Sequence, residues 1–159
     1  MTFRVGFGTD IHRLIKGRAL IIGGVEIESD LGSEGHSDAD VLLHAVTDAI
    51  LGALALGDIG AHFPNTDDRW RDASSHVFLK RAAELMREHG YELGNADCTI
   101  HLEAPKLRPY IDRIRAHVAA ILITETENIS VKAKTGEGVD AVGEGRAVRA
   151  DATVLLHKP

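Results

Sequence analysis

Several residue types are scarce in this chain of 159 residues, and each scarcity excludes a class of protein. Cysteine occurs once, as Cys98, which excludes an internal disulfide framework and fits a reducing compartment. Aromatic residues make up only 4% of the chain, too few for a platform that stacks single-stranded nucleic acid. Acidic residues outnumber lysine and arginine by 24 to 18, so the chain is not expected to carry a basic nucleic-acid-binding face.

Long apolar runs are missing as well. No run reaches the roughly 18 residues that a membrane-spanning helix needs, and the first residues, MTFRVGFG, lack the pattern of a signal peptide. We therefore expect a cytoplasmic protein without a membrane or nucleic-acid partner. The hydrophobic content of 44% is enough for a core, so residues 1–159 are expected to form a single domain.

Hydrophobic periodicity predicts that strands and helices alternate along the chain. The expected elements are strands at 2–8, 92–104, 129–135 and 146–156, a hairpin with a Gly23-Gly24 turn at 19–27, and helices at 39–56, 74–89 and 109–123. Ser37 or Asp38 could cap the first helix, Gly90 could end the second, and Pro109 falls in the first turn of the third. This order favours an α+β fold, in which one layered domain has a mixed β-sheet with helices packed on one face. Alternation in the last two strands predicts that the other face is wet or meets another subunit.

The segment FGTDIHRL places Asp10 and His12 two residues apart, where the first strand is expected to end. This spacing puts both side chains on one face of a strand. His44 lies in the apolar run VLLHAVTDAIL, one helical turn before Asp48. One interpretation is a core histidine satisfied by Asp48, and the other is a metal ligand. Asp10, His12 and His44 together form a three-ligand set suited to a catalytic Zn²⁺ with an open fourth position.

Four polar segments hold further candidates, although each also has ordinary loop composition. The segments are GHSDAD with His36 and Ser37, GDIGAHFPNTD with Asp58, Gly60 and Asp67, EAPKLRP with Lys106 and Arg108, and KAKTGEG with Lys134, Thr135 and Glu137. Donors, cations and a carboxylate of these kinds suit a phosphate or a Mg²⁺-bound diphosphate. Loops beside a metal-bearing helix are common places for substrate contacts.

Taken in order, the segments resemble one family, the 2-C-methyl-D-erythritol 2,4-cyclodiphosphate synthases of the non-mevalonate isoprenoid pathway. The matching motifs are GTDIHRL, IIGGVEI, GHSDADVLLHAVTDAILGALALGDIGAHFPNTD, GYELGNAD, APKLRPYI and VKAKTGEG. They cover nearly the whole chain, and the HSDAD block followed by LGDIG and FP is highly specific.

The resemblance implies a homotrimeric lyase with active sites between neighbouring subunits, which converts 4-diphosphocytidyl-2-C-methyl-D-erythritol 2-phosphate to the cyclic diphosphate and releases CMP. It implies one Zn²⁺ per chain on Asp10, His12 and His44, and a Mg²⁺ or Mn²⁺ on Glu137 with the substrate diphosphate. It also implies His36 and Thr135 as catalytic residues. Asp48 is expected to orient the imidazole of His44 or His12.

The substrate-binding residues are likewise implied by the resemblance, with Asp58, Gly60 and the 63–67 turn for the methylerythritol and 102–108 for the cytosine. They are Asp10, His12, His36, Ser37, Asp58, Ile59, Gly60, Phe63, Pro64, Asn65, Thr66, Asp67, Leu102, Glu103, Ala104, Pro105, Lys106, Leu107, Arg108, Lys134, Thr135, Gly136 and Glu137.

The segment after Glu137 departs from the family pattern. Ala141 replaces a phenylalanine, Glu144 an arginine and Arg146 a glutamate, at positions that line an axial cavity of the family's trimer. Lys134 replaces a threonine and could add a contact to the substrate phosphates. We expect Glu144 and Arg146 to pair across the trimer axis, and the loss of the aromatic wall argues against a prenyl diphosphate in that cavity.

Two rival functions fit parts of the same pattern. A metal-dependent phosphohydrolase could use the Asp10, His12 and His44 set with a water nucleophile, but it would not need the EAPKLRP segment. A trimeric binding module could keep the fold without activity, and the altered 139–146 segment leaves room for it. Release of CMP distinguishes the synthase from both.

Overall fold

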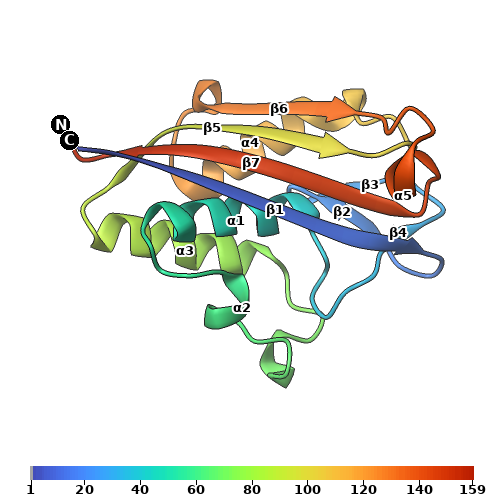
Figure 1. Cartoon of the computed structure of the whole chain (residues 1–159), viewed down its shortest axis with the longest axis horizontal. Coiled ribbons are helices and arrows are strands. Elements are labelled where there is room, and N and C mark those ends of the chain that lie inside the picture. The colour runs from blue at the N-terminus through green and yellow to red at the C-terminus, as the bar shows by residue number, and fades with distance from the viewer. Residues whose placement is uncertain (1) are drawn as a thin grey trace.

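The structure is a computed structural model that describes residues 2–159. Five strands form one sheet in the order β4-β1-β7-β5-β6, and β2 and β3 form a separate hairpin (Figure 1). The elements are β1 (Phe3–Ile15), β2 (Leu20–Ile22), β3 (Val25–Ile27), β4 (Gly32–Ser33), α1 (Val41–Ala53), α2 (Ile59–His62), η1 (Asp68–Trp70), α3 (His76–Glu88), β5 (Glu92–His101), η2 (Arg108–Tyr110), α4 (Ile111–Leu122), η3 (Thr126–Asn128), β6 (Ile129–Lys134), α5 (Asp140–Gly143) and β7 (Ala147–His157).

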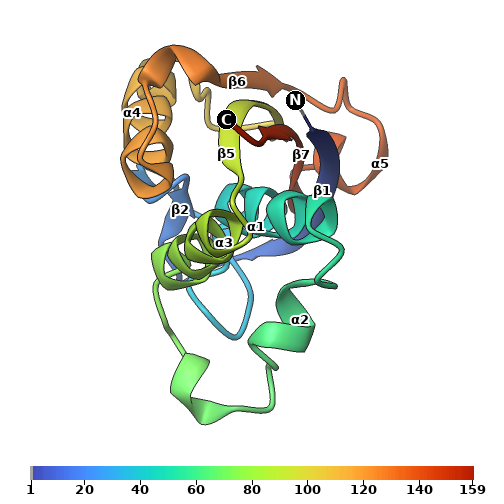
Figure 2. The same cartoon turned by 90° about the vertical axis from the view of Figure 1, so that its left-hand side faces the viewer.

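The sheet is mixed, as predicted. β1 and β5 both pair with β7 in antiparallel fashion, whereas β5 and β6 run parallel. Helices α1, α3 and α4 lie on one side of the sheet (Figure 2), and their apolar side chains join those of the sheet in one core. The α+β class with helices on one face is therefore confirmed. None of the helices within residues 2–159 has the length and apolar character needed to cross a membrane.

Strand β1 is longer than predicted. We expected a strand at 2–8 that ends before Asp10, but β1 continues to Ile15. β7 provides the reason, because it gives a partner to every residue from Phe3 to Arg13, including Asp10 opposite Ala150 and His12 opposite Val148. Asp10 and His12 therefore sit within a paired strand, which restricts their backbone more than a loop would.

Two glycines of β1 let helix α1 lie directly on the strand. A Cβ atom on Gly6 would be 1.8 Å from the carbonyl oxygen of Ala49, and one on Gly8 would be 2.0 Å from that of Ala45. Both distances are far below van der Waals contact, so only glycine fits at these positions. This close approach brings His44 of α1 over Asp10 of β1.

Helix α1 begins at a different cap from the one predicted. Asp40, not Ser37 or Asp38, is the N-cap, and its carboxylate accepts hydrogen bonds from the amides of Leu42 and Leu43. The same buried carboxylate accepts from the amides of Gly23 and Gly24 at 2.9 and 2.6 Å, which ties the hairpin turn to the helix. Burial raises the pKa of Asp40 to about 6, although the amides of Leu43, Gly24 and Gly23 partly oppose this shift.

Other boundaries differ slightly from the prediction. The strand expected at 92–104 ends at His101, and the helix expected at 74–89 runs from His76 to Glu88. Pro109 lies in the 3-10 turn η2, one turn before α4 begins at Ile111. The Gly23-Gly24 turn is confirmed, with φ values of 60° and 75° that suit glycine.

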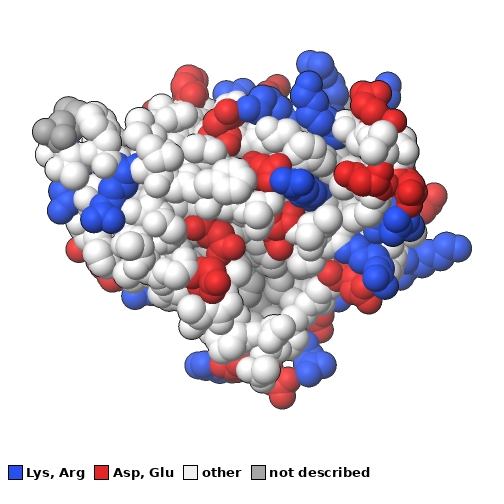
Figure 3. All heavy atoms as spheres, in the orientation of Figure 1, with Lys and Arg blue, Asp and Glu red and all other residues white. Residues whose placement is uncertain are grey.

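The face of the sheet opposite the helices is open, as the alternation predicted. On β1 the side chains of Phe3, Val5, Phe7 and Ile11 are all more than half exposed. Figure 3 views this open face, where uncharged surface is broad toward the left and charged side chains are densest on the right. A row of large exposed apolar side chains on one strand is typical of a surface that meets another chain.

Candidate active site

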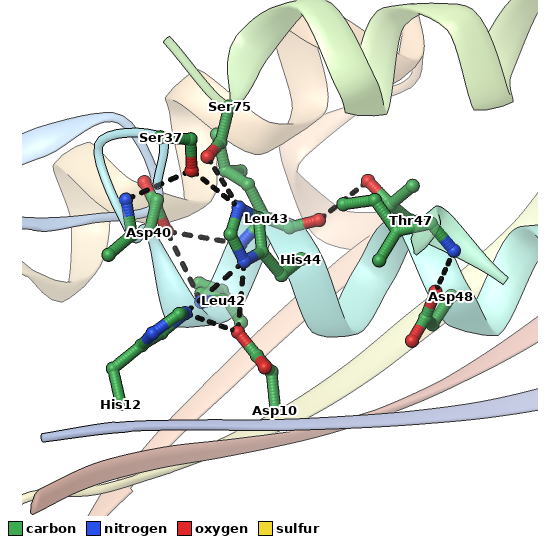
Figure 4. A network of polar contacts seen from close by, with 12 residues as sticks. Asp10, His12, Ser37, Asp40, Leu42, Leu43, His44, Thr47, Asp48 and Ser75 are labelled. Atoms are coloured by element: carbon green, nitrogen blue, oxygen red, sulfur yellow. Dashed lines mark hydrogen bonds and ion pairs between the residues drawn. The ribbon is translucent and has the colours of Figure 1, made fainter. Parts of the chain in front are cut away.

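Asp10, His12 and His44, which we call the metal group, come together as the sequence predicted. One ligand atom from each lies within 4.8 Å of the others. The Oδ2 atom of Asp10 is 2.8 Å from Nε2 of His12 and 3.0 Å from Nδ1 of His44. Figure 4 shows Asp10 and His12 rising from β1 toward the imidazole on α1.

The charges within the metal group stabilise one another. Burial by itself raises the pKa of Asp10, but hydrogen bonds with His12 and His44 outweigh it and lower the pKa to about 2. Burial lowers the pKa of His12, whereas the hydrogen bond to Asp10 raises it, and the net direction is upward. Asp10 is therefore a carboxylate at neutral pH, as a metal ligand must be.

Each imidazole of the metal group is held in place by hydrogen bonds to the ring nitrogen that faces away from Asp10. The Nδ1–H of His12 donates to the carbonyl oxygen of Glu34 at 2.9 Å, which directs Nε2 toward Asp10. His44 has the opposite orientation, with Nδ1 toward Asp10 and Nε2 toward the hydroxyls of Ser37 and Ser75. A carboxylate flanked by two imidazoles that are each supported from behind fits a zinc ion with three protein ligands.

Asp48 does not orient an imidazole, so that prediction is wrong. Its Oδ1 atom accepts a hydrogen bond from the amide of Ile59 at 2.7 Å, because the chain turns back on α1 at this point. Asp48 therefore positions the start of α2. Burial is the main cause that raises its pKa.

His36 and Ser37 lie on the loop beside the metal group. The ring of His36 is hydrogen bonded through Nε2 to the carbonyl oxygen of Asp67 at 3.2 Å, which joins this loop to segment 58–67. Ser37 is buried, with its hydroxyl 3.2 Å from Nε2 of His44. The structure thus brings Ser37 to the metal group and joins His36 to segment 58–67.

Segment 58–67 is built from two capped turns. Asp58 caps α2 through the amide of Ala61, and Asp67 caps η1 and binds Arg69 at 2.6 Å. Phe63 packs against Phe78, with ring centroids 4.7 Å apart. The same segment carries the remaining predicted substrate contacts, and all of them but Ile59 are exposed. They are Ile59, Gly60, Pro64, Asn65 and Thr66.

A separate pocket of about 690 Å³, the β6–α4 pocket, collects most of the remaining predicted residues. Its lining includes Leu102, Glu103, Pro105, Lys106, Leu107, Arg108, Lys134 and Thr135. The carboxylate of Glu103 accepts from the amide of Gly136 at 2.8 Å and joins the two loops of the pocket. The hydroxyl of Thr135 donates a hydrogen bond to Glu137 at 3.2 Å. The two loops also contain three predicted residues that are not part of the lining, namely Ala104, Gly136 and Glu137.

The metal group and the β6–α4 pocket do not meet within one chain. Among the described residues, no member of the metal group and none of segment 58–67 lines the pocket. Glu137 likewise is not among the residues whose ligand atoms come together with Asp10. One chain therefore presents the predicted site as two separate halves.

Comparison with known proteins identifies the family. A model of the YgbB family matches residues 3–157. The chain belongs to the YgbB family. It is 54% identical over 154 residues to the 2-C-methyl-D-erythritol 2,4-cyclodiphosphate synthase of Salinibacter ruber, covering 97% of this chain and 98% of that protein.

Two further similarities extend this result. The chain is 56% identical over 158 residues to a bifunctional enzyme IspD/IspF of Albidiferax ferrireducens, covering 99% of this chain but only 38% of that longer protein. A solved structure of 2C-methyl-D-erythritol-2,4-cyclodiphosphate synthase in a CDP-bound form superposes with a TM-score of 0.90 at 41% identity, covering 97% of this chain and all of that one.

Within this member of the YgbB family, the residues at the predicted axial cavity pair locally. Arg146 binds Glu144 of the same chain at 2.5 Å. Pairing of these two residues across subunits stays a prediction. The chain turns tightly at Gly145, with φ of 73°, which brings the two side chains together. Ala141 lies in α5 and leaves no aromatic ring at that position.

Three residues around the site were missed by the sequence analysis. Arg18 donates to the carbonyl oxygens of Gly35 and Ser37 and thereby supports the loop of His36. Ser75 contacts His44 of the metal group, and Asp38 contacts Ser75. Nothing in the local sequence marks these contacts, because each depends on how separate elements pack.

Proposed function

We propose that this chain converts 4-diphosphocytidyl-2-C-methyl-D-erythritol 2-phosphate to 2-C-methyl-D-erythritol 2,4-cyclodiphosphate and CMP, as a phosphorus–oxygen lyase of the non-mevalonate isoprenoid pathway. The observation that carries this proposal is the convergence of Asp10, His12 and His44 in a YgbB family member. Relatives that carry this enzyme name match the chain over nearly its whole length.

The reaction needs no protein nucleophile. An oxygen of the substrate's 2-phosphate attacks the β-phosphorus, the new P–O bond closes the ring, and the P–O bond to CMP breaks with its electron pair leaving on CMP. Zn²⁺ on the metal group, with Mg²⁺ or Mn²⁺ at Glu137, would supply positive charge to the phosphates. Because both reacting phosphates belong to one molecule, the protein contributes mainly by positioning them.

The residues of the chain divide this task. His36 and Ser37 beside the metal group offer donors to the reacting phosphates. Thr135 and Lys134 at the β6–α4 pocket offer a hydroxyl and a cation. The 102–108 loop is suited to cytosine because its backbone groups can pair with a planar ring edge.

We further propose that the chain is a single domain over 1–159 and acts as a cytoplasmic homotrimer. Two observations support this assembly: the apolar side chains of β1 on the open face and the separation of the metal group from the β6–α4 pocket. In a cyclic trimer the metal group of one chain would complete the pocket of its neighbour. Buried Cys98 is compatible with a reducing cytoplasm.

The first test measures metal content together with the products formed from the cytidylyl substrate. About one zinc per chain, with equimolar CMP and cyclic diphosphate, supports the synthase. Free phosphate instead of the cyclic product would indicate the phosphohydrolase, and substrate binding without turnover would indicate the binding module.

The shared site has its own test. His44→Ala and Thr135→Ala chains, each inactive alone, are unfolded together and refolded as mixed trimers. If each site takes its two halves from different chains, random mixing gives about a quarter of the wild-type activity. Activity that stays at the level of the separate variants would contradict a site shared between subunits.

A further inference from the structure

A chain of hydrogen bonds supports the metal group from behind. Nε2 of His44 is 2.8 Å from Oγ of Ser75, and Oγ of Ser75 in turn contacts Oδ1 of Asp38. Ser75 is fully buried and His44 nearly so, so water does not replace these contacts. Figure 4 shows Ser75 above the imidazole, on the side opposite Asp10.

The direction of each hydrogen bond follows from the donors around Asp38. Its carboxylate accepts from the amide of Asp40 at 3.1 Å and from the amide of Ser75 at 3.0 Å. A carboxylate can only accept, so the single hydroxyl hydrogen of Ser75 is given to Asp38. The oxygen of Ser75 is then left as an acceptor, and its remaining neighbour is Nε2–H of His44.

This direction determines which nitrogen of His44 can bind a metal. Nδ1 is the nitrogen that faces Asp10, whose Oδ2 atom is 3.0 Å away. With the proton held on Nε2, Nδ1 can give up its own proton when a metal binds and direct its lone pair to that metal. Ser37 also lies near Nε2, but at the longer distance of 3.2 Å, and its oxygen already accepts from the amide of Ala39. The hydroxyl hydrogen of Ser37 therefore stays available for a substrate phosphate.

We propose that Asp38 and Ser75 are positioning residues that hold the proton of His44 on Nε2 and so prepare Nδ1 as the metal ligand. This inference rests on the proposed metal site. It adds to that site a hydrogen-bonded serine and carboxylate that come from outside the metal group. Removing such an outer partner of a metal-bound histidine weakens metal binding by about 10- to 100-fold.

The test compares zinc affinity, measured by competition with a chelator, in wild-type protein and two sets of variants. Ser75→Ala and Asp38→Asn should bind zinc about 10- to 100-fold more weakly, whereas Ser75→Thr should restore most of the affinity. Ser74→Ala is the matched control, because Ser74 is exposed and next in sequence, and its affinity should equal that of wild type. Urea unfolding of the metal-free proteins separates loss of fold from loss of zinc.

A second readout observes the proton itself. In zinc-loaded wild type, proton–nitrogen NMR correlation should show a slowly exchanging Nε2–H on His44, and Ser75→Ala should lose this protection. Unchanged zinc affinity and unchanged protection in Ser75→Ala would overturn the positioning role while leaving the metal site intact. Absence of zinc from the wild type would instead overturn the proposed function. If Ser75→Ala does not fold, Ser75→Cys makes the same test, because a thiol is a weak acceptor.

Discussion

The metal group lies between β1 and α1, and hydrogen bonds from other parts of the chain hold both of its imidazoles in place. The β6–α4 pocket differs, because three of the cations that line it are exposed side chains: Lys106, Arg108 and Lys134. The metal group is thus prepared by the fold of one chain. The β6–α4 pocket holds its cations in solvent and has no metal group beside it. This difference fits the proposed assembly, in which the first half is made within one chain and the second is completed by a neighbour.

The largest expected effect comes from removing a metal ligand. His44→Ala should lose zinc and reduce CMP release by about a thousandfold or more, because Nδ1 of His44 is one of the three proposed protein ligands. The fold should survive, since β1, α1 and their glycine contacts remain. Zinc analysis and CMP assays measure both effects, with His89→Ala, at the end of α3, as the control. Full activity of His44→Ala would refute the metal assignment.

The close contact of β1 and α1 can be disrupted by a substitution that leaves Asp10, His12 and His44 unchanged. In Gly8→Ala the new Cβ would fall 2.0 Å from the backbone oxygen of Ala45, so α1 must move away from the strand. We expect a loss of about 3 kcal/mol in the free energy of unfolding and weaker zinc binding, because His44 moves with α1.

Gly52→Ala on α1 is the matched control for this change. A Cβ on Gly52 meets only the carbonyl oxygen of Phe7, at 3.9 Å, which is an ordinary contact. Alanine is the better helix former, so this variant should be more stable by up to about 1 kcal/mol. If Gly8→Ala were as stable as Gly52→Ala, the tight approach would not be what positions His44.

The two halves also differ in how far they could be predicted from the sequence. The spacing of Asp10 and His12, together with the family resemblance, predicted a metal group that the structure brings together. The predicted end of the first strand was wrong. Pairing with β7 and packing against α1 extend the strand past Asp10 and His12, although both residues are polar. The contact of Ser75 with His44 could not be predicted, because it depends on how α3 packs against α1.

The pH dependence of stability offers a smaller effect in the metal group. The metal group lowers the pKa of Asp10 from its ordinary value of 3.8 to about 2, so the folded state binds fewer protons than the unfolded state in this range. The carboxylate of Asp10 therefore adds about 2 kcal/mol to the free energy of unfolding above pH 3.8, and this stabilisation is lost as pH falls to 2. The pKa of His12 is raised in the folded protein, so its contribution to the free energy of unfolding is fully present below pH 6.5. This contribution is lost as pH rises through the pKa that His12 has in the folded protein.

Urea unfolding of metal-free wild type and Asp10→Asn tests this window. The difference in free energy should be largest between about pH 4 and 6.5 and smaller on either side. Asp40 acts in the opposite sense between pH 3.8 and 6, because its folded pKa is raised to about 6. Both proteins carry Asp40, so its effect cancels in the difference. A difference independent of pH would mean that Asp10 and His12 are not an ion pair in solution.

The smallest effect is expected at the β6–α4 pocket. Lys134 lines it with an exposed side chain, and none of the ion pairs among the described residues includes it. Lys132, two residues earlier on β6, lines the same pocket but binds Asp97 at 2.7 Å. Lys134→Ala should weaken binding of CDP by about tenfold, near 1.4 kcal/mol, and Lys132→Ala by less, because its ammonium is already paired.

Calorimetric titration of CDP at low and high salt measures this contrast, since added salt screens exposed charges. The loss caused by Lys134→Ala should shrink as salt rises, while zinc affinity stays at the wild-type value. Equal losses for the two lysines would mean that total charge matters and that neither side chain has a specific contact. A change in zinc affinity would mean that Lys134 also acts on a metal group, which the separation of the two halves within one chain allows only across the interface of the proposed trimer.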